Sequence, residues 1–183
     1  INTRRLDAAA LDRLPSAFET DLFRSLSLRP GITRTSDYSS RLYIRGGGHG
    51  HTLVRLDGTT IYNPTHFLGF YSLFHPEAIG QVDLHKGPYP ASYGGRLGSV
   101  IDVQTKSGTT RSRSGTFTLG LTASGGHIEG PLGSDASPWG SYMVAARRST
   151  SELLLLGLQQ TGKPWIPDDA SFTDLNARLD ATL

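Results

Sequence analysis

Residues 52–62 read Thr-Leu-Val-Arg-Leu-Asp-Gly-Thr-Thr-Ile-Tyr, a hairpin pattern in the first half of the chain. Two β-prone segments flank Asp57-Gly58, and Asp-Gly in that setting is a strong signal for a two-residue turn. Just before it, residues 41–45 alternate as a strand and lead into the glycines at residues 46–48. This stretch predicts β structure with tight turns that depend on glycine.

Two short helices are predicted upstream of the hairpin. The first covers residues 6–14 and ends at Pro15, because a proline restricts the residue before it to extended conformations. The second covers roughly residues 20–28, with Thr20 as its N-cap, an apolar stripe along one face, and Pro30 after its end.

Downstream of the hairpin, residues 75–79 fit one helical turn, with proline at its first position. Residues 81–85 and 99–105 fit strands, and the glycine-rich segment 86–98 between them fits a long turn. Residues 1–107 are therefore predicted to form a small α+β unit, a mixed sheet with short helices.

The pattern changes after this block. Residues 108–114 form a polar linker, and residues 116–122 and 172–183 alternate strictly between apolar and polar side chains. One interpretation is a soluble sheet with one wet face. The other is part of a transmembrane β-barrel, whose remaining strands would lie beyond Leu183. Gly125-Gly126 fits either a bulge in one long strand or a turn between two short ones.

Composition narrows the function classes. The 183 residues include 22 glycines and no cysteine, and the formal net charge is +2. The lack of cysteine excludes disulfides, thiolate metal sites and cysteine nucleophiles. The basic residues are scattered, so no nucleic-acid footprint is expected. The first residues lack a signal-peptide pattern, and both ends are expected to be cuts in a longer protein.

The histidines and glycines of residues 46–51 are the first candidates for chemistry. His49 and His51 could bind a metal, but loop histidines beside permissive glycines explain the pattern more simply. The glycine run matches neither a P-loop nor a dinucleotide fingerprint, and no nucleophile elbow is present. We therefore expect no enzyme activity, no cofactor and no metal, with a soluble periplasmic metal-binding enzyme that uses His49 and His51 as a remote alternative.

A loop dense in aromatic residues runs from Tyr62 to Phe74. Exposed aromatic side chains on a loop typically mark recognition, although about half of these are expected to be buried. The candidate ligand-binding residues are Tyr62, Asn63, His66, Phe67, Phe70 and Tyr71.

Several of these stretches, in their order, resemble a known family. Residues 41–47 and 53–58 resemble the plug-domain signature of TonB-dependent receptors, an extended Arg-Gly strand followed by an Asp-Gly hairpin. Residues 81–103, which include Pro-Ala and Tyr-Gly-Gly-Arg-Leu segments, resemble the stretch that follows it in the family. Residues 128–132, 145–149 and 172–178 resemble the first barrel strands of the subgroup common in Bacteroidetes-like bacteria.

The resemblance implies a plug inside an outer-membrane barrel of about 22 strands. Residues 1–107 would be the plug domain, residues 108–114 a linker, and residues 115–183 the first antiparallel strands of a truncated transmembrane β-barrel. In the family, the arginines that match Arg45 and Arg96 face barrel carboxylates and lock the plug.

The function implied by the resemblance is energy-coupled uptake of a scarce nutrient, namely an iron chelate, cobalamin, an oligosaccharide or a peptide. TonB would act through an N-terminal segment that is not in this chain. The other implied partners are the protein's own barrel, the outer membrane and a small ligand, with no nucleic acid. A signalling receptor with little transport is the alternative.

Overall fold

The computed structural model describes residues 3–7, 20–36, 39–66, 69–120, 122–134, 137–150 and 171–181. The chain divides into two compact units, Ile1–Lys106 and Ser107–Leu183. Among the described residues, no helix is long and apolar enough to cross a membrane.

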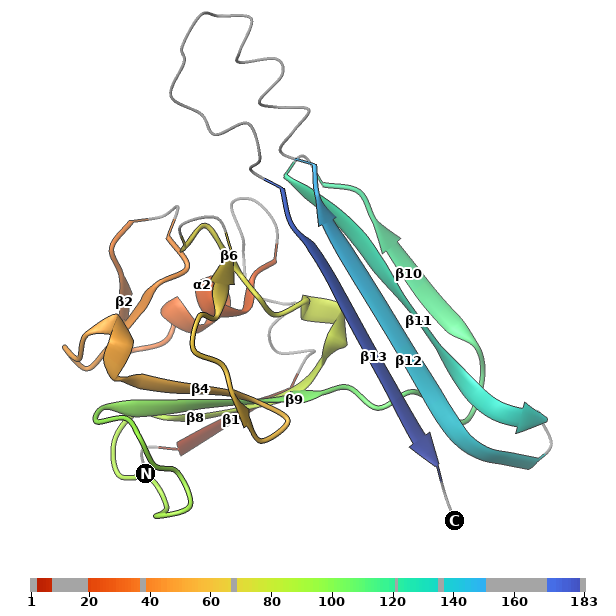
Figure 1. Ribbon diagram of the computed structural model, residues 1–183, viewed down its shortest axis with the longest axis horizontal. Coiled ribbons are helices and arrows are strands. Elements are labelled where there is room, and N and C mark those ends of the chain that lie inside the picture. The colour runs from red at the N-terminus through yellow and green to blue at the C-terminus, as the bar shows by residue number, and fades with distance from the viewer. Residues whose placement is uncertain are drawn as a thin grey trace, which may run out of the picture. The chain divides into compact units, whose positions relative to one another are not determined.

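A five-stranded mixed sheet forms the centre of the first unit, with the strand order β1-β8-β9-β4-β5 (Figure 1). All neighbours are antiparallel except β4 and β9, which run parallel and therefore need the long connection between them. The strands are β1 (Thr3–Asp7), β4 (Thr52–Leu56), β5 (Thr59–Thr60), β8 (Ile79–His85) and β9 (Ser99–Thr105).

The predicted hairpin is confirmed by β4 and β5, which pair across Asp57-Gly58. Both turn residues have positive φ, 47° at Asp57 and 82° at Gly58, as the primed turns of hairpins require. The Asp57 carboxylate also accepts the backbone N–H of Thr105 at 2.8 Å, so the turn is fixed to the end of β9.

Shorter elements cover the sheet. They are the helix α2 (Leu22–Ser27), the pair β2 (Ile32–Arg34) and β3 (Leu42–Ile44), the pair β6 (Thr65–His66) and β7 (Tyr71–Ser72), and the 3-10 helices His49–His51 and Pro76–Ala78. The predicted second helix and the helical turn near Pro76 are thus present.

Two expectations at the N-terminal end are wrong. The cap of α2 is Asp21 and not Thr20, because the Asp21 carboxylate accepts the N–H groups of Phe23 and Arg24, both at 3.0 Å. The first helix does not begin at Leu6, which lies in β1 opposite Val82. Pairing with β8 and burial of Leu6 override the local helix signal. The rest of that predicted helix, residues 8–14, lies outside the described residues.

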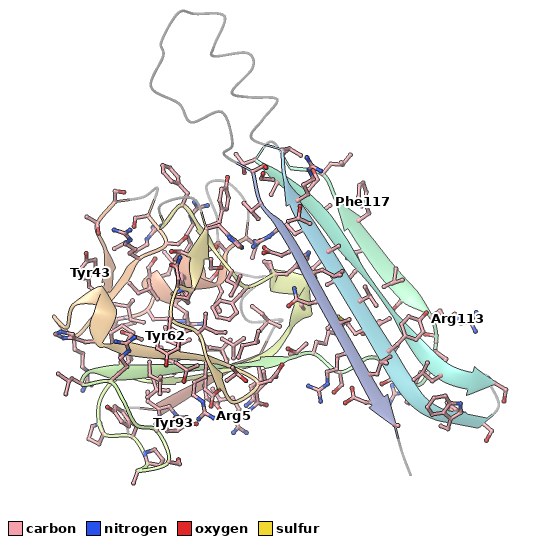
Figure 2. The ribbon with its side chains drawn as sticks, viewed as in Figure 1. Arg5, Tyr43, Tyr62, Tyr93, Arg113 and Phe117 are labelled. Atoms are coloured by element: carbon pink, nitrogen blue, oxygen red, sulfur yellow. The ribbon has the colours of Figure 1, made fainter. Side chains whose placement is uncertain are left out.

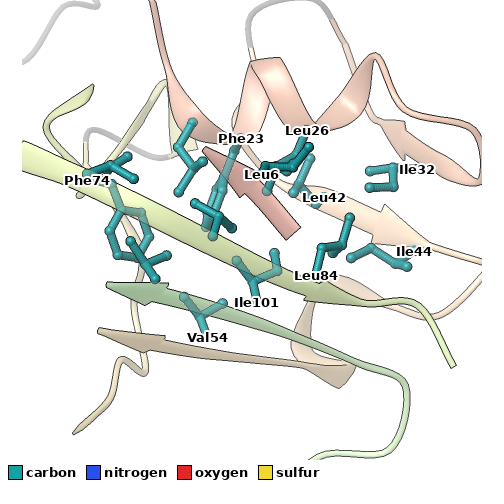
Figure 3. Packing of buried hydrophobic residues seen from close by; sticks show 14 residues of the cluster. Leu6, Phe23, Leu26, Ile32, Leu42, Ile44, Val54, Phe74, Leu84 and Ile101 are labelled. Carbon is teal, nitrogen blue, oxygen red and sulfur yellow. The ribbon is translucent and has the colours of Figure 1, made fainter. Parts of the chain in front are cut away.

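The core of the first unit lies on one face of the sheet, under α2 and the β2–β3 pair (Figure 3). Leu26 from the helix and Val82, Leu84 and Val103 from the central strands are completely buried. Burying each such side chain stabilises the fold by roughly 1.5–3 kcal/mol before conformational entropy is counted.

The second unit is a four-stranded antiparallel sheet in the order β10-β11-β12-β13. The strands are β10 (Ser114–Thr118), β11 (Ala123–Ser134), β12 (Ser137–Ser149) and β13 (Thr173–Ala181). Gly125 and Gly126 lie inside β11 and pair in regular register with β10 and β12. They are neither a turn nor a bulge, and the register shift lies farther on, at Leu132/Gly133.

The two faces of this second sheet differ sharply. One face carries exposed apolar side chains on three strands, with exposed fractions from 57% to 74% at Phe117, Ile128, Leu175 and Leu179 (Figure 2 labels Phe117). On the opposite face, Arg147 forms an ion pair with Asp174 at 2.5 Å, and both side chains are buried. The sheet is therefore amphipathic, with polar groups paired across neighbouring strands.

Candidate functional site

The aromatic loop, residues 62–74, folds back on itself as a small hairpin. Thr65 pairs with Ser72 and His66 with Tyr71, while the Leu73 N–H donates to the Pro64 carbonyl at 2.9 Å. The turn needs Gly69, whose φ of 100° is unfavourable for residues with a side chain.

A buried carboxylate anchors this loop to the helix. Asp21 is 1% exposed, and besides capping α2 it accepts the Ser72 N–H at 2.7 Å. The Phe70 carbonyl accepts from the Arg24 guanidinium at 2.8 Å and lies 2.9 Å from the Ser40 hydroxyl. The loop is thus held in one place by α2 and the segment before β3. An acidic residue directly before an apolar stripe was the available signal for Asp21.

The aromatic residues of the loop divide between surface and interior. Tyr62, labelled in Figure 2, is 83% exposed, and Asn63 and Phe70 are also exposed. Tyr71 is only 8% exposed, and its ring lies 5.7 Å from the Arg24 guanidinium. His66 is half-buried, whereas Phe67 lies outside the described residues. Among the described residues, the side chains open to a ligand therefore lie at the start of the loop and at Phe70.

A cavity of about 320 Å³ lies beside the start of this loop. Tyr62, Asn63 and Thr65 line it from the loop, and Arg41 and Arg96 line it from other segments. Its apolar part comes from core residues, namely Phe23, Val54 and Ile101. The fold therefore brings Tyr62, Asn63 and Arg96, which the sequence singled out for two different roles, to one cavity.

The two arginines predicted to lock the plug lie in different settings. Arg45 follows β3, is exposed, and has a positive φ of 50°. It does not line the cavity, and its N–H donates to the Gly31 carbonyl at 2.9 Å. Arg96 is half-buried in the 86–98 loop, where its carbonyl accepts the Tyr89 hydroxyl.

Tyr93 fastens the 86–98 loop to the open face of the sheet. Its hydroxyl donates to Asp102 at 3.0 Å, and its ring packs 5.2 Å from both the Arg55 guanidinium and the His85 ring. Burial, followed by the hydrogen bond to Asp102, raises the pKa of the Tyr93 hydroxyl above its usual 10.0. No sequence pattern indicated this cluster beyond the glycine-rich turn that carries Tyr93.

Two histidines of the first unit have structural contacts. His75 accepts the Glu77 N–H at 3.2 Å at the start of a 3-10 helix, and the His51 carbonyl accepts the Gly98 N–H at 3.0 Å. In the part of the chain that the structure describes, no three His, Cys, Asp or Glu residues gather as a metal site would require.

Comparison with known proteins identifies the fold of both units. The family model described as TonB-dependent Receptor Plug Domain matches residues 3–100. The vitamin B12 transporter BtuB of Vibrio vulnificus (strain YJ016) is 30% identical over 102 residues, which cover 53% of this chain and 16% of that protein. The chain therefore spans a small part of this curated relative.

Two solved structures show the same fold. The siderophore receptor PirA from Pseudomonas aeruginosa matches with a TM-score of 0.60 and 21% identity, covering 97% of this chain and 32% of that one. PirA from Acinetobacter baumannii matches with a TM-score of 0.60 and 22% identity, covering 81% and 24%. The antiparallel strands of the second unit resemble those of receptor barrels. These relatives are transporters and receptors rather than enzymes. The chain belongs to the TonB-dependent receptor plug domain family, whose members are outer-membrane proteins.

Proposed function

We propose that the protein is a TonB-dependent importer in which residues 1–107 form the plug and residues 115–183 the first strands of the surrounding barrel, joined by the linker 108–114. The observation that carries this proposal is the amphipathic sheet that follows the plug-family match. TonB would supply energy by pulling on an N-terminal segment, and the plug would open a path for a scarce nutrient.

The exposed face of the second sheet suits lipid. Large apolar side chains more than half exposed on three of the four strands would be an aggregation hazard in water, but they match the outward band of a transmembrane barrel. The opposite face suits a wet interior, because Arg147 and Asp174 satisfy each other there. A soluble sheet would bury its apolar face instead.

The proposed ligand site is the aromatic loop. Tyr62, Asn63 and Phe70 offer exposed surface, His66 lies half-buried in the same hairpin, and Phe67 completes the set in the sequence. Tyr71 is also part of the proposed site, and its ring packs against the Arg24 guanidinium. An iron chelate, cobalamin, an oligosaccharide or a peptide would meet this loop from outside. Arg45 and Arg96 are proposed to lock the plug against carboxylates of the barrel.

Cell fractionation of the full-length protein tests the proposal. Outer-membrane extracts are run on a gel with and without boiling, because a closed barrel resists unfolding in detergent until it is heated. We expect a band in the outer-membrane fraction whose mobility shifts on boiling. A soluble band with no shift would mean that the amphipathic strands belong to an ordinary sheet, and the importer proposal would be withdrawn.

A further inference from the structure

An arginine directly before β10 lies over a glycine of the neighbouring strand. A Cβ added at Gly130 of β11 would meet Cγ of Arg113 at 2.8 Å and the hydroxyl oxygen of Tyr142 at 3.0 Å (Figure 2 labels Arg113). Gly130 and Tyr142 are register partners across β11 and β12. Because Gly130 has no side chain, Arg113 and Tyr142 meet above it, in what is hereafter the Arg113–Tyr142 notch.

The notch lies on the apolar face of the second sheet. Gly130 follows Ile128 by two residues, and positions two apart on a strand share a face. Tyr142 is also the register partner of Leu179 on β13, whose side chain is 73% exposed. Since the importer proposal places this face against lipid, the notch would also contact lipid.

The lengths of the strand connections indicate which side of the membrane the notch faces. Residues 135–136 join β11 to β12, whereas the much longer segment 150–172 joins β12 to β13. Transmembrane barrels have short turns on the periplasmic side and longer loops on the extracellular side. Gly130 lies near the short connection, because β11 ends at Ser134. The notch would therefore face the periplasmic leaflet, which consists of phospholipids.

The two side chains suit the boundary between acyl chains and headgroups. Arg113 is exposed while its Cγ lies over Gly130, which is buried. A long basic side chain at such a boundary keeps its stem on apolar surface and extends its charged head to the polar layer. Tyrosine is enriched at the same depth, with its ring in the apolar layer and its hydroxyl in the polar one. A guanidinium also matches a phosphate with two parallel hydrogen bonds.

We propose that the Arg113–Tyr142 notch binds the phosphate of a phospholipid in the periplasmic leaflet. The Arg113 guanidinium holds the phosphate, and the Tyr142 hydroxyl donates a second kind of hydrogen bond to it. The acyl chains lie along Ile128 and Leu179 on the same face. The inference rests on the importer function proposed above, and it adds a lipid partner that is separate from the nutrient.

Native mass spectrometry of the full-length receptor in detergent tests the proposal. The probe is palmitoyl-oleoyl-phosphatidylglycerol, and palmitoyl-oleoyl-glycerol, which lacks the phosphate, is the control lipid. We expect tighter binding of the phospholipid, weakened about fivefold in Arg113→Gln, as for loss of one basic residue near a membrane surface. Gly130→Ala keeps every charge but should weaken binding similarly, because the new Cβ displaces both side chains of the notch. Arg111→Gln, which removes the same charge from an exposed residue outside the notch, should leave binding unchanged.

Three outcomes would overturn the proposal: equal binding of the two lipids, an equal loss in Arg111→Gln, or full phospholipid binding in both Arg113→Gln and Gly130→Ala. A carboxylate on the barrel strand that closes against β10 is the alternative partner of Arg113. It would show as a lower temperature of the heat shift in Arg113→Gln with unchanged phospholipid binding, and it would also overturn the lipid assignment. The heat shift of the parent receptor separates the two proposals. If the shift is present, failure of lipid binding counts against this inference alone, whereas a soluble parent with no shift would overturn the importer proposal as well.

Discussion

At the scale of single residues, Asp21 connects the helix α2 to the aromatic loop, a role that no sequence motif indicated. One carboxylate oxygen caps α2, and the other holds the Ser72 amide of the aromatic loop. Because the group is almost fully buried, each N–H that loses its acceptor would remain without water. The position of the candidate ligand loop therefore depends on a residue that does not face the ligand.

Replacing Asp21 with Asn should destabilise the plug by about 1–3 kcal/mol, because an amide offers one acceptor oxygen and turns an N–H₂ group toward the other set of donors. The plug transition in calorimetry of the full-length receptor measures this. Asp83→Asn is the matched control, since its partner Arg5 is largely exposed and such pairs contribute about 0–1 kcal/mol. Equal losses in the two variants would contradict the role given to Asp21.

The Tyr93 hydroxyl makes the plug sensitive to alkaline pH. Because its folded pKa is raised, its stabilising contribution is complete below pH 10.0 and is lost as the pH rises through the folded pKa. Tyr93→Phe should lower stability by about 1 kcal/mol at neutral pH. In thermal melts, the difference in stability between Tyr93→Phe and the wild type should shrink above pH 10. Tyr62→Phe, at an exposed ring, should match wild type throughout, and a Tyr93→Phe difference that stays constant with pH would refute the assignment.

At the scale of elements, the β4–β5 hairpin depends on backbone conformation at two residues. Asp57 and Gly58 both adopt positive φ, and the Gly58 carbonyl also accepts the Arg55 guanidinium at 2.7 Å. The hairpin thus fixes the end of β4, which is the only strand parallel to β9 among the described strands. Its position bears on the site because Ile61 and Tyr62 continue directly from β5 into the cavity.

Gly58→Ala should cost about 1–2 kcal/mol, because a left-handed conformation brings Cβ close to the carbonyl oxygen. Space is also tight, since the new Cβ would lie 3.2 Å from Arg55 Nη2. Gly94→Ala is the matched control, because a Cβ there meets nothing within 4 Å and Gly94 is not among the positive-φ residues. Denaturant unfolding measures the free energy of unfolding of both variants. Equal losses would mean that the hairpin does not depend on a positive φ at Gly58.

At the scale of the whole molecule, the chain combines two sheets that differ in whether their apolar face is buried. The first unit buries one face of its sheet under α2 and the β2–β3 pair. The second leaves its apolar face exposed and pairs its charges on the other. A sheet of this second kind needs an apolar solvent, which the outer membrane provides for this family.

A charge placed on the apolar face should block assembly. Leu175→Arg is expected to cost roughly 2–4 kcal/mol if the residue lies near the membrane midplane, and so to reduce the heat-shifted band. Asn176→Arg, one residue along on the opposite face, should be tolerated, because Arg178 already places a guanidinium on that face. Equal assembly of both variants in outer-membrane extracts would mean that the face does not contact lipid.

The sequence by itself determined the local and repetitive features. The Asp-Gly turn, the helix before Pro30, and the alternation along residues 172–181 follow from φ preferences and side-chain periodicity, which act within a few residues. The ordered motifs between Arg41 and Val103 also pointed to the family that the comparison shows. The subgroup common in Bacteroidetes-like bacteria stays a prediction, because the relatives compared come from other genera.

Only the tertiary structure decided features that depend on partners distant in sequence. Leu6 lies in a strand because β8 pairs with it, and Asp21 caps α2 because Ser72 and Ser40 meet the same carboxylate. Local signals at these positions were ambiguous, and long-range pairing and burial selected between them. The meeting of Arg41 with Arg96 has no local signal at all, because the crossover between the parallel strands β4 and β9 carries Arg96 back to the cavity.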